Sequence, residues 1–514
     1  MAKLVNAWTL KVHLFWSLGF KSLKKKFLRM NCLFLCSSDF SLALYILTAI
    51  IFCVIFTNFR SYSFPALLSI LTSSSIFVFI MLLIQLIDLS DSSFIFLNGL
   101  SSYSSFSVFF QILLFITGCF LLFLNRSYYS IRRLYQYEFD LLFLFSFLAL
   151  SSLCFCNDFL VIYVILELQS LAFYILAGFW KNSEYSNEAG LRYFIIGAFS
   201  SCLLMLSFSF IYVSVGSTSF DTIVNLISED LIKFNLHFFG VCLFFAGIFF
   251  KLGAVPCHFW ICDVYEGSLT NISAFFSIIP KSIIFCLLFK SVSLAFSNYS
   301  QICSLIITAS GITSVFVSSL AGLYQKKIKR LLAYSAIGHT GFILLAFSSG
   351  KLDSIRSALL YLVIYIVMNL GLFSLLLGFS LQGFLFKYLI NWSFLKKWNI
   401  TISLALAILL FSIAGIPPLA GFYSKLNVLL LLIFENRVVL ALTLVILSCV
   451  SCFFYIRLIK ILFFSSSGNI LFDVNNLKGF ELSLTTSFLF VIFFLTKPES
   501  LNNLLSFVTL LFIS

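Results

Sequence analysis

The sequence predicts an all-α, polytopic membrane protein with about 14 transmembrane helices, and three observations indicate this fold class. Of the 514 residues, 61% are hydrophobic and only 10% are charged, and the mean hydropathy is +1.10. A soluble domain of this composition would have too little polar surface to cover itself. The apolar residues lie in runs of about 20, the length that a helix needs to cross a hydrocarbon core. We find no alternation typical of a β-barrel.

Fourteen apolar windows approach this length, and polar or charged loops separate them. In chain order, they lie at residues 40–58, 66–88, 105–124, 138–156, 159–179, 190–215, 236–256, 270–293, 301–323, 331–349, 357–381, 400–433, 438–463 and 481–496.

The net charge of +13 is distributed unevenly over the loops. Loops after odd-numbered windows are basic, with Arg60 and the run 326–330 as examples, whereas Asp88 and Asp221 lie in loops after even-numbered windows. Basic loops stay on the side from which a membrane protein is inserted, so both termini are expected on the outer side. The basic residues 1–38 break this pattern. We interpret them as a surface-lying or partner-binding extension, and an uncounted extra span is the alternative.

Two groups of five windows have matching features. Windows seven and twelve each contain a lysine close to proline, whereas windows five and ten contain Glu167 and His339. Matching broken helices are typical of inverted repeats in transporters. The predicted parts are a basic extension (1–38), N-terminal helices (39–137), a first five-helix repeat (138–293), a second five-helix repeat (301–463), and a C-terminal helix and tail (464–514).

Few ionisable side chains lie inside the windows, and because charge is expensive in a membrane, each of them is a candidate site. Glu167 lies nine residues past Asp158, so it is about 13 Å deep at ~1.5 Å per residue. Lys281 lies near the middle of its window, whereas Lys251 and Lys425 adjoin predicted helix breaks. His339 is either a buried, hydrogen-bonded histidine or a proton relay.

Four of the six prolines adjoin these lysines, namely Pro256, Pro280, Pro417 and Pro418. A proline within a helix removes one backbone hydrogen bond and displaces the carbonyl four residues earlier. The carbonyls expected to be freed are those of Leu252, Phe276, Ile413 and Ala414. In a membrane, such carbonyls need protein or water as partners. Lysines beside water-filled breaks favour a proton or ion path, and lysines that snorkel or form fixed ion pairs are the alternative.

Four stretches carry a family resemblance: "SNEAGLRYFIIGAFSS", "FKLGAVPCHFWICDVYEGS", "IKRLLAYSAIGHTGF" and "AGIPPLAGFYSKL". Together they resemble subunit 2 of mitochondrial NADH:ubiquinone oxidoreductase, respiratory complex I, which is similar to the Mrp-type antiporter subunits. The resemblance covers about residues 140–460. The stretch "SIIPKSIIF" looks more like mitochondrial members.

The resemblance implies roles for individual residues. Glu167 matches the family's fifth-helix glutamate, and Lys251, Lys281 and Lys425 match its lysines in the first broken helix, the central helix and the second broken helix. Where the family usually has lysine in "EAxxKYF", this chain has Arg192. Arginine stays protonated, so we expect Arg192 to be a fixed positive partner of Glu167.

The resemblance also implies a function. It predicts the H⁺-translocating activity of NADH:ubiquinone reductase, with protons moving along Lys251, Lys281, His339 and Lys425, driven by quinone reduction in other subunits. The chain is expected to have no redox centre or cofactor, because NADH, flavin, iron–sulfur clusters and ubiquinone belong elsewhere in the complex. The expected partners are other membrane-arm subunits and the lipid of the mitochondrial inner membrane. The 68 phenylalanines agree with a gene rich in A and T, as organellar genes often are.

Two other functions stay open. A free-standing cation/proton antiporter is expected to have several carboxylates inside its spans, where only Glu167 is well placed. In a structural, non-pumping subunit, the lysines would form fixed bridges. Cys449 and Cys452 form a C-x-x-C inside an apolar run, so we interpret them as small core residues and predict no metal site. No basic run is interleaved with aromatics as in nucleic-acid-binding proteins.

Overall fold

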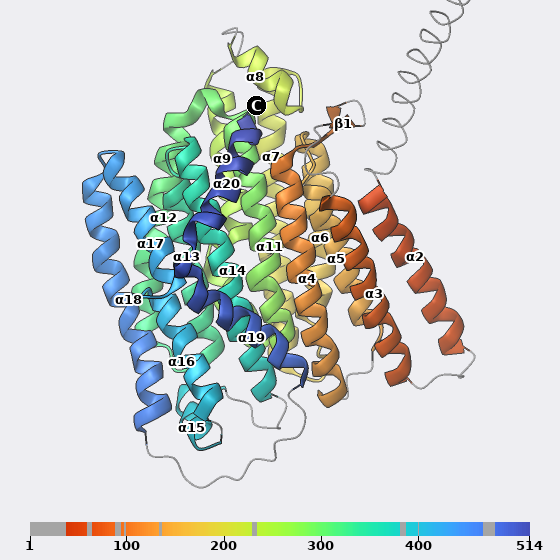
Figure 1. Ribbon diagram of the computed structural model, residues 1–514. Helices are drawn as coiled ribbons and strands as arrows, with labels where there is room; N and C mark the ends of the chain where they lie inside the picture. Colours follow the sequence, from red (N-terminus) through yellow and green to blue (C-terminus); the bar gives the residue numbers. More distant parts are fainter. Residues whose placement is uncertain are drawn as a thin grey trace, which may run out of the picture.

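Long apolar helices form almost all of the structure. The computed structural model describes residues 37–58, 64–87, 94–96, 99–132, 136–228, 234–380, 387–398, 400–465 and 478–513. The predicted basic extension at 1–38 therefore lies almost entirely outside the described residues. The helices stand side by side in one bundle (Figure 1), which confirms the all-α fold class.

Among the described residues, ten helices lie between Ser37 and Lys290. They are α2 (Ser37–Asn58), α3 (Phe64–Ile87), α4 (Ser105–Arg132), α5 (Glu138–Leu153), α6 (Phe159–Ala177), α7 (Glu184–Val215), α8 (Phe220–Ser228), α9 (Phe234–Leu252), α10 (Phe259–Gly267) and α11 (Thr270–Lys290). Two short antiparallel strands join α3 to α4: β1 (Phe94–Phe96) and β2 (Ser101–Tyr103), with Phe94 opposite Tyr103.

The described residues after Lys290 form nine further α-helices. They are α12 (Ser300–Tyr324), α13 (Ile328–Phe347), α14 (Leu352–Ser380), α15 (Leu395–Trp398), α16 (Ile400–Ala414), α17 (Ala420–Phe434), α18 (Val438–Phe464), α19 (Lys478–Phe493) and α20 (Pro498–Ile513). A π-helical turn, Ser291–Ala295, follows α11, and short 3₁₀ turns lie at Ser297–Tyr299, Leu389–Phe394 and Phe494–Thr496.

Local sequence explains several helix ends. Asp158 caps α6, because its carboxylate accepts a hydrogen bond from the backbone N–H of Leu160 at 2.8 Å. Ser183 caps α7 in the same way through Ser186, and Gly216, with a φ of 83°, ends α7 in the left-handed conformation that favours glycine. Asp158, Ser183 and Gly216 all lie in the loops that separate the apolar windows of the sequence.

Ten helices in the described part of the chain are long and apolar enough to cross a membrane, and the bent pair α19–α20 can add an eleventh. All fourteen windows contain helix, but several of these helices are short. The window 400–433 holds two helices of 15 residues each, and α5 has only 16 residues. The chain is a multi-pass membrane protein with fewer full-length spans than the sequence predicts, because breaks and loops interrupt the apolar runs.

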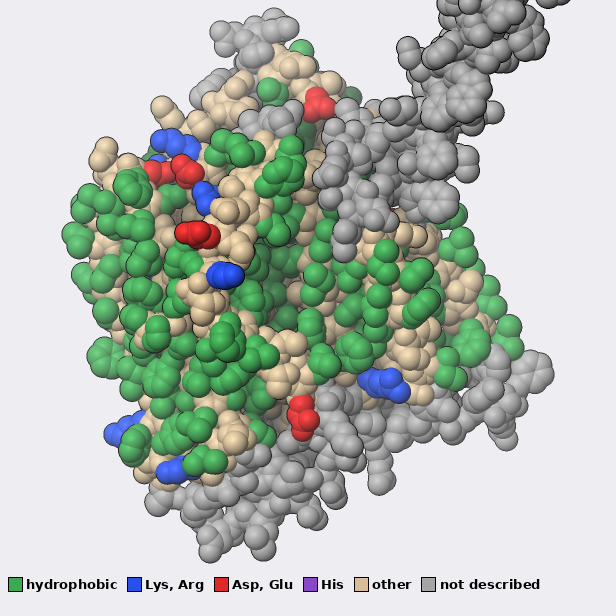
Figure 2. Space-filling view, viewed as in Figure 1, with side chains coloured by type: hydrophobic (Ala, Val, Ile, Leu, Met, Phe, Trp, Pro, Cys, Tyr) green, Lys and Arg blue, Asp and Glu red, His purple; other side chains and the backbone are tan. Residues whose placement is uncertain are grey.

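The most buried helices, α11, α13 and α14, form the core. All residues of α11 from Asn271 to Lys290 are buried, whereas only 28% of the apolar window is buried in each of α2 and α18. On the face drawn in Figure 2, hydrophobic side chains cover most of the surface and charged ones are few. This distribution is the one expected of a protein in lipid.

The basic loops meet at one end of the bundle, as the loop charges predict. Tyr128, Trp180, Gly267, Lys327 and Lys387 come from the loops after the third, fifth, seventh, ninth and eleventh windows, and they line one shared cavity. The C-terminus lies at the opposite end, near α8 (Figure 1). The described structure does not test whether the two five-helix groups are inverted repeats, and that prediction stands.

The C-terminal region contains a helix that the sequence analysis did not separate from its tail. α19 and α20 meet at an angle of 93°, and they cross the bundle on the face shown in Figure 1. Both pack on α14 and α4. They therefore connect an N-terminal helix to the core.

Candidate functional site

The first helix break separates α9 from α10 and begins before Pro256. α9 ends at Leu252, and Gly253, with a φ of 69°, turns the chain. The carbonyl of Phe249 accepts a hydrogen bond from the N–H of Ala254 at 3.0 Å, and that of Phe250 accepts from Trp260 Nε1 at 2.9 Å. The structure has a break here, and the carbonyls of Phe249 and Phe250 find partners beyond it. Neither carbonyl is bound by Lys251.

The second break separates α16 from α17, and here a lysine occupies it. α16 ends at Ala414, and the residue four positions later is Pro418, which has no N–H to donate. Lys425 Nζ donates to the carbonyl of Ala414 at 2.7 Å. Gly415 has a φ of 83°, and a Cβ atom at this position would lie 2.7 Å from the Lys425 side chain. The predicted association of lysine, proline and a freed carbonyl is therefore confirmed at Ala414.

The predicted break at Pro280 is wrong. α11 runs from Thr270 to Lys290 with Pro280 inside it. Tyr365 of α14 donates its hydroxyl to the carbonyl of Ser277 at 3.1 Å, one residue after Phe276, whose carbonyl loses its helical donor at the proline. The helix continues past the proline within tight packing, because all of its residues from Asn271 to Lys290 are buried.

Lys281, His339 and Lys425 come together in the core. Their exposed fractions are 4%, 6% and 8%. Lys281 Nζ donates to the carbonyl of Ala336 on α13 at 3.3 Å, and His339 follows on the same face of α13 three residues later. Lys425 Nζ lies 5.6 Å from the ring centroid of Phe342, three residues further along α13 than His339. His339 therefore lies between the two lysines.

Aromatic side chains surround Lys281, His339 and Lys425, which together form a buried line through the core. Two of these aromatic residues, Tyr361 and Tyr365, were not identified from the sequence. Tyr361 Oη lies 2.9 Å from Nδ1 of His339, and the Tyr365 ring centroid lies 5.3 Å from that of His339. Lys281 Nζ is 6.0 Å from the Tyr365 ring, and Lys425 Nζ is 5.6 Å from the ring of Phe342. The spacing of the tyrosines in "YLVIY" places both on one face of α14, which is the signal that could have identified them.

Glu167 and Lys251 are not in ion-pair contact. Glu167 Oε2 lies 3.4 Å from the hydroxyl of Ser170, whereas its buried Oε1 has no hydrogen-bond partner among the described residues. Lys251 is half-buried in the last turn of α9. In the described part of the chain, no carboxylate forms an ion pair with Lys251.

Arg192 does not form the expected pair with Glu167. Its guanidinium, 47% exposed, forms ion pairs with Glu188 and Asp263. The packing of α6 against α7 explains the difference, because Tyr174 of α6 stacks edge-on against Phe194 of α7 at 5.2 Å. Glu167 lies about two helical turns from Tyr174, away from the end at which Arg192 lies.

The ion pairs of Arg192 belong to a network at the basic end of the bundle. Lys327 pairs with Glu266, and Arg330 pairs with both Asp263 and Glu266. The network connects α7, α10 and α13, so it links the half-helix that follows the first break to the helix that carries His339. Asp263 and Glu266, the two carboxylates of "DVYEGS", therefore lie at the basic end of the bundle and not among the core lysines.

The cysteines and metal-ligand types give no further site among the described residues. No group of three or more His, Cys, Asp or Glu side chains there has an arrangement that could hold a metal ion. Cys449 and Cys452 are free; Cys449 is exposed, and Cys452 donates its thiol to the carbonyl of Ala414 at 3.2 Å. The interpretation of both as core residues is wrong for Cys449, since α18 is a peripheral helix.

Comparisons with known proteins agree on one family. Residues 156–451 match the family described as NADH:quinone oxidoreductase/Mrp antiporter, transmembrane. NADH-ubiquinone oxidoreductase chain 2 of Arabidopsis thaliana is 35% identical over 455 residues, which are 87% of this chain and 90% of the relative. NADH-quinone oxidoreductase subunit N of Paramagnetospirillum magneticum is 35% identical over 371 residues, 71% of this chain and 76% of the relative.

Solved structures have the same fold. A chain of respiratory complex I from Thermus thermophilus gives a TM-score of 0.75 at 23% identity, over 91% of this chain and 98% of that one. A chain of the Mrp complex from Dietzia gives a TM-score of 0.78 at 15% identity, over 92% of this chain and 96% of that one.

Proposed function

The chain belongs to the NADH:quinone oxidoreductase/Mrp antiporter family, and from this premise we propose that it translocates protons as a membrane-arm subunit of an NADH:ubiquinone oxidoreductase. The observation that supports the proposal most strongly is the buried line Lys281–His339–Lys425. Three ionisable groups in the core of a membrane protein are expensive, and a fold without a transport function has no need of them.

The chemistry of this line suits proton transfer. Among the described residues, no carboxylate forms an ion pair with Lys281 or Lys425, so each can lose its proton without leaving a buried, unpaired anion. Both ammonium groups donate to backbone carbonyls, at 3.3 Å and 2.7 Å. A carbonyl stabilises the charged lysine by less than a carboxylate would. Water and His339 can connect the two lysines.

Glu167 and Lys251 form the control point of the path. A lysine holds its proton more firmly when a carboxylate is close and less firmly when it is desolvated. Because the two side chains interact without contact, a small movement of α6 or α9 changes their attraction. Such a movement loads or unloads Lys251, and the proton then passes to Lys281.

The proposal assigns redox chemistry to other subunits. The relatives are named as chains or subunits of NADH oxidoreductases that act on quinone or ubiquinone, and we infer that NADH, flavin, iron–sulfur clusters and ubiquinone are bound outside this chain. The partners are then other membrane-arm subunits. Relatives named as chain 2 from Arabidopsis thaliana and Marchantia polymorpha support a location in the mitochondrial inner membrane, whereas the bacterial relatives are compatible with a plasma membrane.

The Lys281→Ala variant tests the proposal in the assembled complex. The native chain should migrate with NADH dehydrogenase activity on a native gel, and so should the variant. In proteoliposomes, the variant should move fewer protons per NADH oxidised. Lys326→Ala is the matched control, because Lys326 is exposed at the basic end. An undiminished proton yield in Lys281→Ala would refute the proposed path. Migration as a small oligomer without NADH dehydrogenase activity would favour a free-standing antiporter.

A further inference from the structure

A further buried lysine, Lys290, lies at the last position of α11. It is only 2% exposed, and its Nζ donates to the carbonyl of Cys154 at 2.8 Å. This carbonyl follows the C-terminal end of α5. No carboxylate in the described residues forms an ion pair with Lys290. The proposed path through Lys281 does not use it.

A carboxylate from another helix contacts the same end of α5. Asp39, in the first turn of α2, accepts hydrogen bonds from Ser151 Oγ at 2.6 Å and from Gln111 Nε2 at 3.3 Å. Ser151 lies one turn before Cys154 on α5, and the N–H of Cys154 donates to the carbonyl of Ser151. The last turn of α5 thus connects the ammonium of Lys290 to the carboxylate of Asp39.

Lys290 and Asp39 both contact the C-terminal end of α5. Lys290 bonds to the carbonyl of Cys154, and Asp39 bonds to the hydroxyl of Ser151. Asp39 is only half-buried, and the neighbouring Phe40 is exposed. The pair therefore extends from the buried end of α11 towards the surface where α2 begins. In the orientation that the loop charges predict, this is the outer side.

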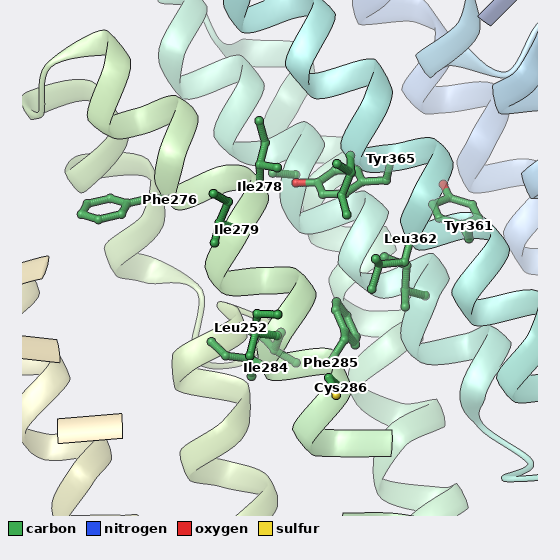
Figure 3. Close-up of a cluster of buried hydrophobic side chains, with 14 of the residues drawn as sticks. Leu252, Phe276, Ile278, Ile279, Ile284, Phe285, Cys286, Tyr361, Leu362 and Tyr365 are labelled. Atoms are coloured by element: carbon green, nitrogen blue, oxygen red, sulfur yellow. The ribbon is translucent and has the colours of Figure 1, made fainter. Parts of the chain in front are cut away.

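An apolar layer separates this pair from the central line. Lys290 follows Lys281 by nine residues of α11, about 13.5 Å at ~1.5 Å per residue. The side chains between them are buried and almost all apolar, and they include Ile284, Phe285 and Leu288. Figure 3 shows Ile284, Phe285 and Cys286 packed with Leu252 and Leu362. A proton can cross this layer only when water enters it.

The helix changes geometry where the apolar layer ends. The residues directly after Lys290, Ser291–Ala295, form a π-helical turn. Such turns interrupt regular backbone hydrogen bonding and are frequent at functional sites. The irregular backbone of 291–295 lies beside the buried ammonium of Lys290. In the same way, the break after Ala414 lies beside the ammonium of Lys425.

We propose that Lys290 and Asp39 form a second proton-transfer site that releases protons at the outer end of the bundle. Lys281 gives up one proton, water in the transiently hydrated layer conducts it, and the neutral amine of Lys290 becomes an ammonium. Lys290 then passes the proton to the carboxylate of Asp39, which releases it to bulk water. The apolar layer is the gate between the two sites. This inference rests on the proposed function, because it needs Lys281 as the donor.

A structural role is the competing explanation. An ammonium near the C-terminal end of α5 and a carboxylate in the first turn of α2 both interact favourably with helix dipoles. Two variants separate the roles. Lys290→Arg keeps the charge and a donor for the Cys154 carbonyl but does not release its proton. Lys290→Gln keeps a donor without the charge.

The experiment measures protons moved per NADH oxidised by the assembled complex in proteoliposomes, with assembly checked on a native gel. Lys351→Arg is the control, because Lys351 is exposed. We expect Lys290→Arg and Lys290→Gln to assemble and to lower the proton yield to the level of Lys281→Ala. Asp39→Asn should lower it as well, and Lys351→Arg should not.

The results distinguish failure of this inference from failure of the proposed function. If Lys281→Ala lowers the proton yield but both Lys290 variants keep it, Lys290 is a helix cap and only the inference is overturned. If neither Lys290 variant assembles, the lysine is required for folding and the inference is also overturned. If Lys281→Ala itself keeps the native yield, both the proposed function and the inference fail.

Discussion

The break between α9 and α10 and the break between α16 and α17 both place a lysine beside a glycine with positive φ, but on opposite sides of the break. Lys251 precedes Gly253, and Trp260 takes one of the freed carbonyls. Lys425 follows Gly415, and its own ammonium takes the freed carbonyl of Ala414. Among the described residues, Lys251 therefore has no fixed partner, whereas Lys425 is fixed to the backbone of the break.

This difference assigns different tasks to two lysines that look equivalent in the sequence. A side chain without a fixed partner can change its protonation when a nearby charge moves, so Lys251 suits control of the path. A side chain held at 2.7 Å from a carbonyl keeps its position through many cycles, so Lys425 suits relay along the path. Substitutions at the two breaks should therefore have different effects on stability.

The largest effect is expected for Lys425→Met. The change removes a proton carrier and leaves the buried carbonyl of Ala414 with only the thiol of Cys452. We expect proton translocation to be abolished and the complex to lose about 1–3 kcal/mol of stability, the usual cost of an unsatisfied buried polar group. Proton yield and a thermal melt in detergent measure the two effects. Lys251→Met should reduce the yield with a smaller change in the melt; equal melts would contradict the comparison.

Glu167→Gln should have the next largest effect. Glutamine has nearly the same shape but lacks the charge that we propose controls Lys251, so loading of the lysine should no longer depend on movement of α6 or α9. We expect the proton yield to fall several-fold with normal assembly on a native gel. Glu184→Gln, which removes an exposed carboxylate at the start of α7, is the control. A native yield in Glu167→Gln would show that Lys251 is not controlled by this carboxylate.

Gly415→Ala should have a smaller, partial effect. Its φ of 83° is strained for alanine by about 1–2 kcal/mol, and the new Cβ would press on the Lys425 side chain. Displacement of the ammonium from Ala414 should lower the proton yield. Gly350→Ala has a φ of 68° without any neighbour within 4 Å, so it reproduces the strain alone. Equal proton yields in the two variants would mean that the position of Lys425 does not matter.

Arg192→Gln should have the smallest effect. The guanidinium is exposed and pairs with Glu188 and Asp263, and exposed ion pairs contribute little. We expect assembly and proton yield close to those of the native complex. A loss as large as that of Glu167→Gln would instead restore Arg192 as a partner of Glu167, against the geometry of the structure.

The sequence predicted the helices well, and it drew attention to the buried Lys281 and Lys425, because both signals depend on local properties. Apolar windows identify helices by length and composition, and a buried lysine is conspicuous in an apolar run. Lys290 escaped notice because it lies at a window end, where snorkelling is the ordinary interpretation. Its burial depends on α5, which packs over the end of α11.

The errors concern partners that only the tertiary structure brings together. Pro280 does not break α11, which neighbouring helices bury from Asn271 to Lys290, and Tyr365, 85 positions further along the chain, bonds to the backbone beside it. The register of α6 against α7 keeps Arg192 away from Glu167 and gives it to Asp263. The spacing of residues within one helix does not show which residues of another helix lie beside it.

The central claim is that Lys281 carries a proton rather than only a positive charge. The most direct test is the number of protons moved per NADH by the assembled complex with Lys281→Arg, because arginine keeps the charge and does not release its proton. The account predicts a proton yield as low as that of Lys281→Ala, with NADH dehydrogenase activity still migrating with the chain. A native proton yield in Lys281→Arg would contradict it.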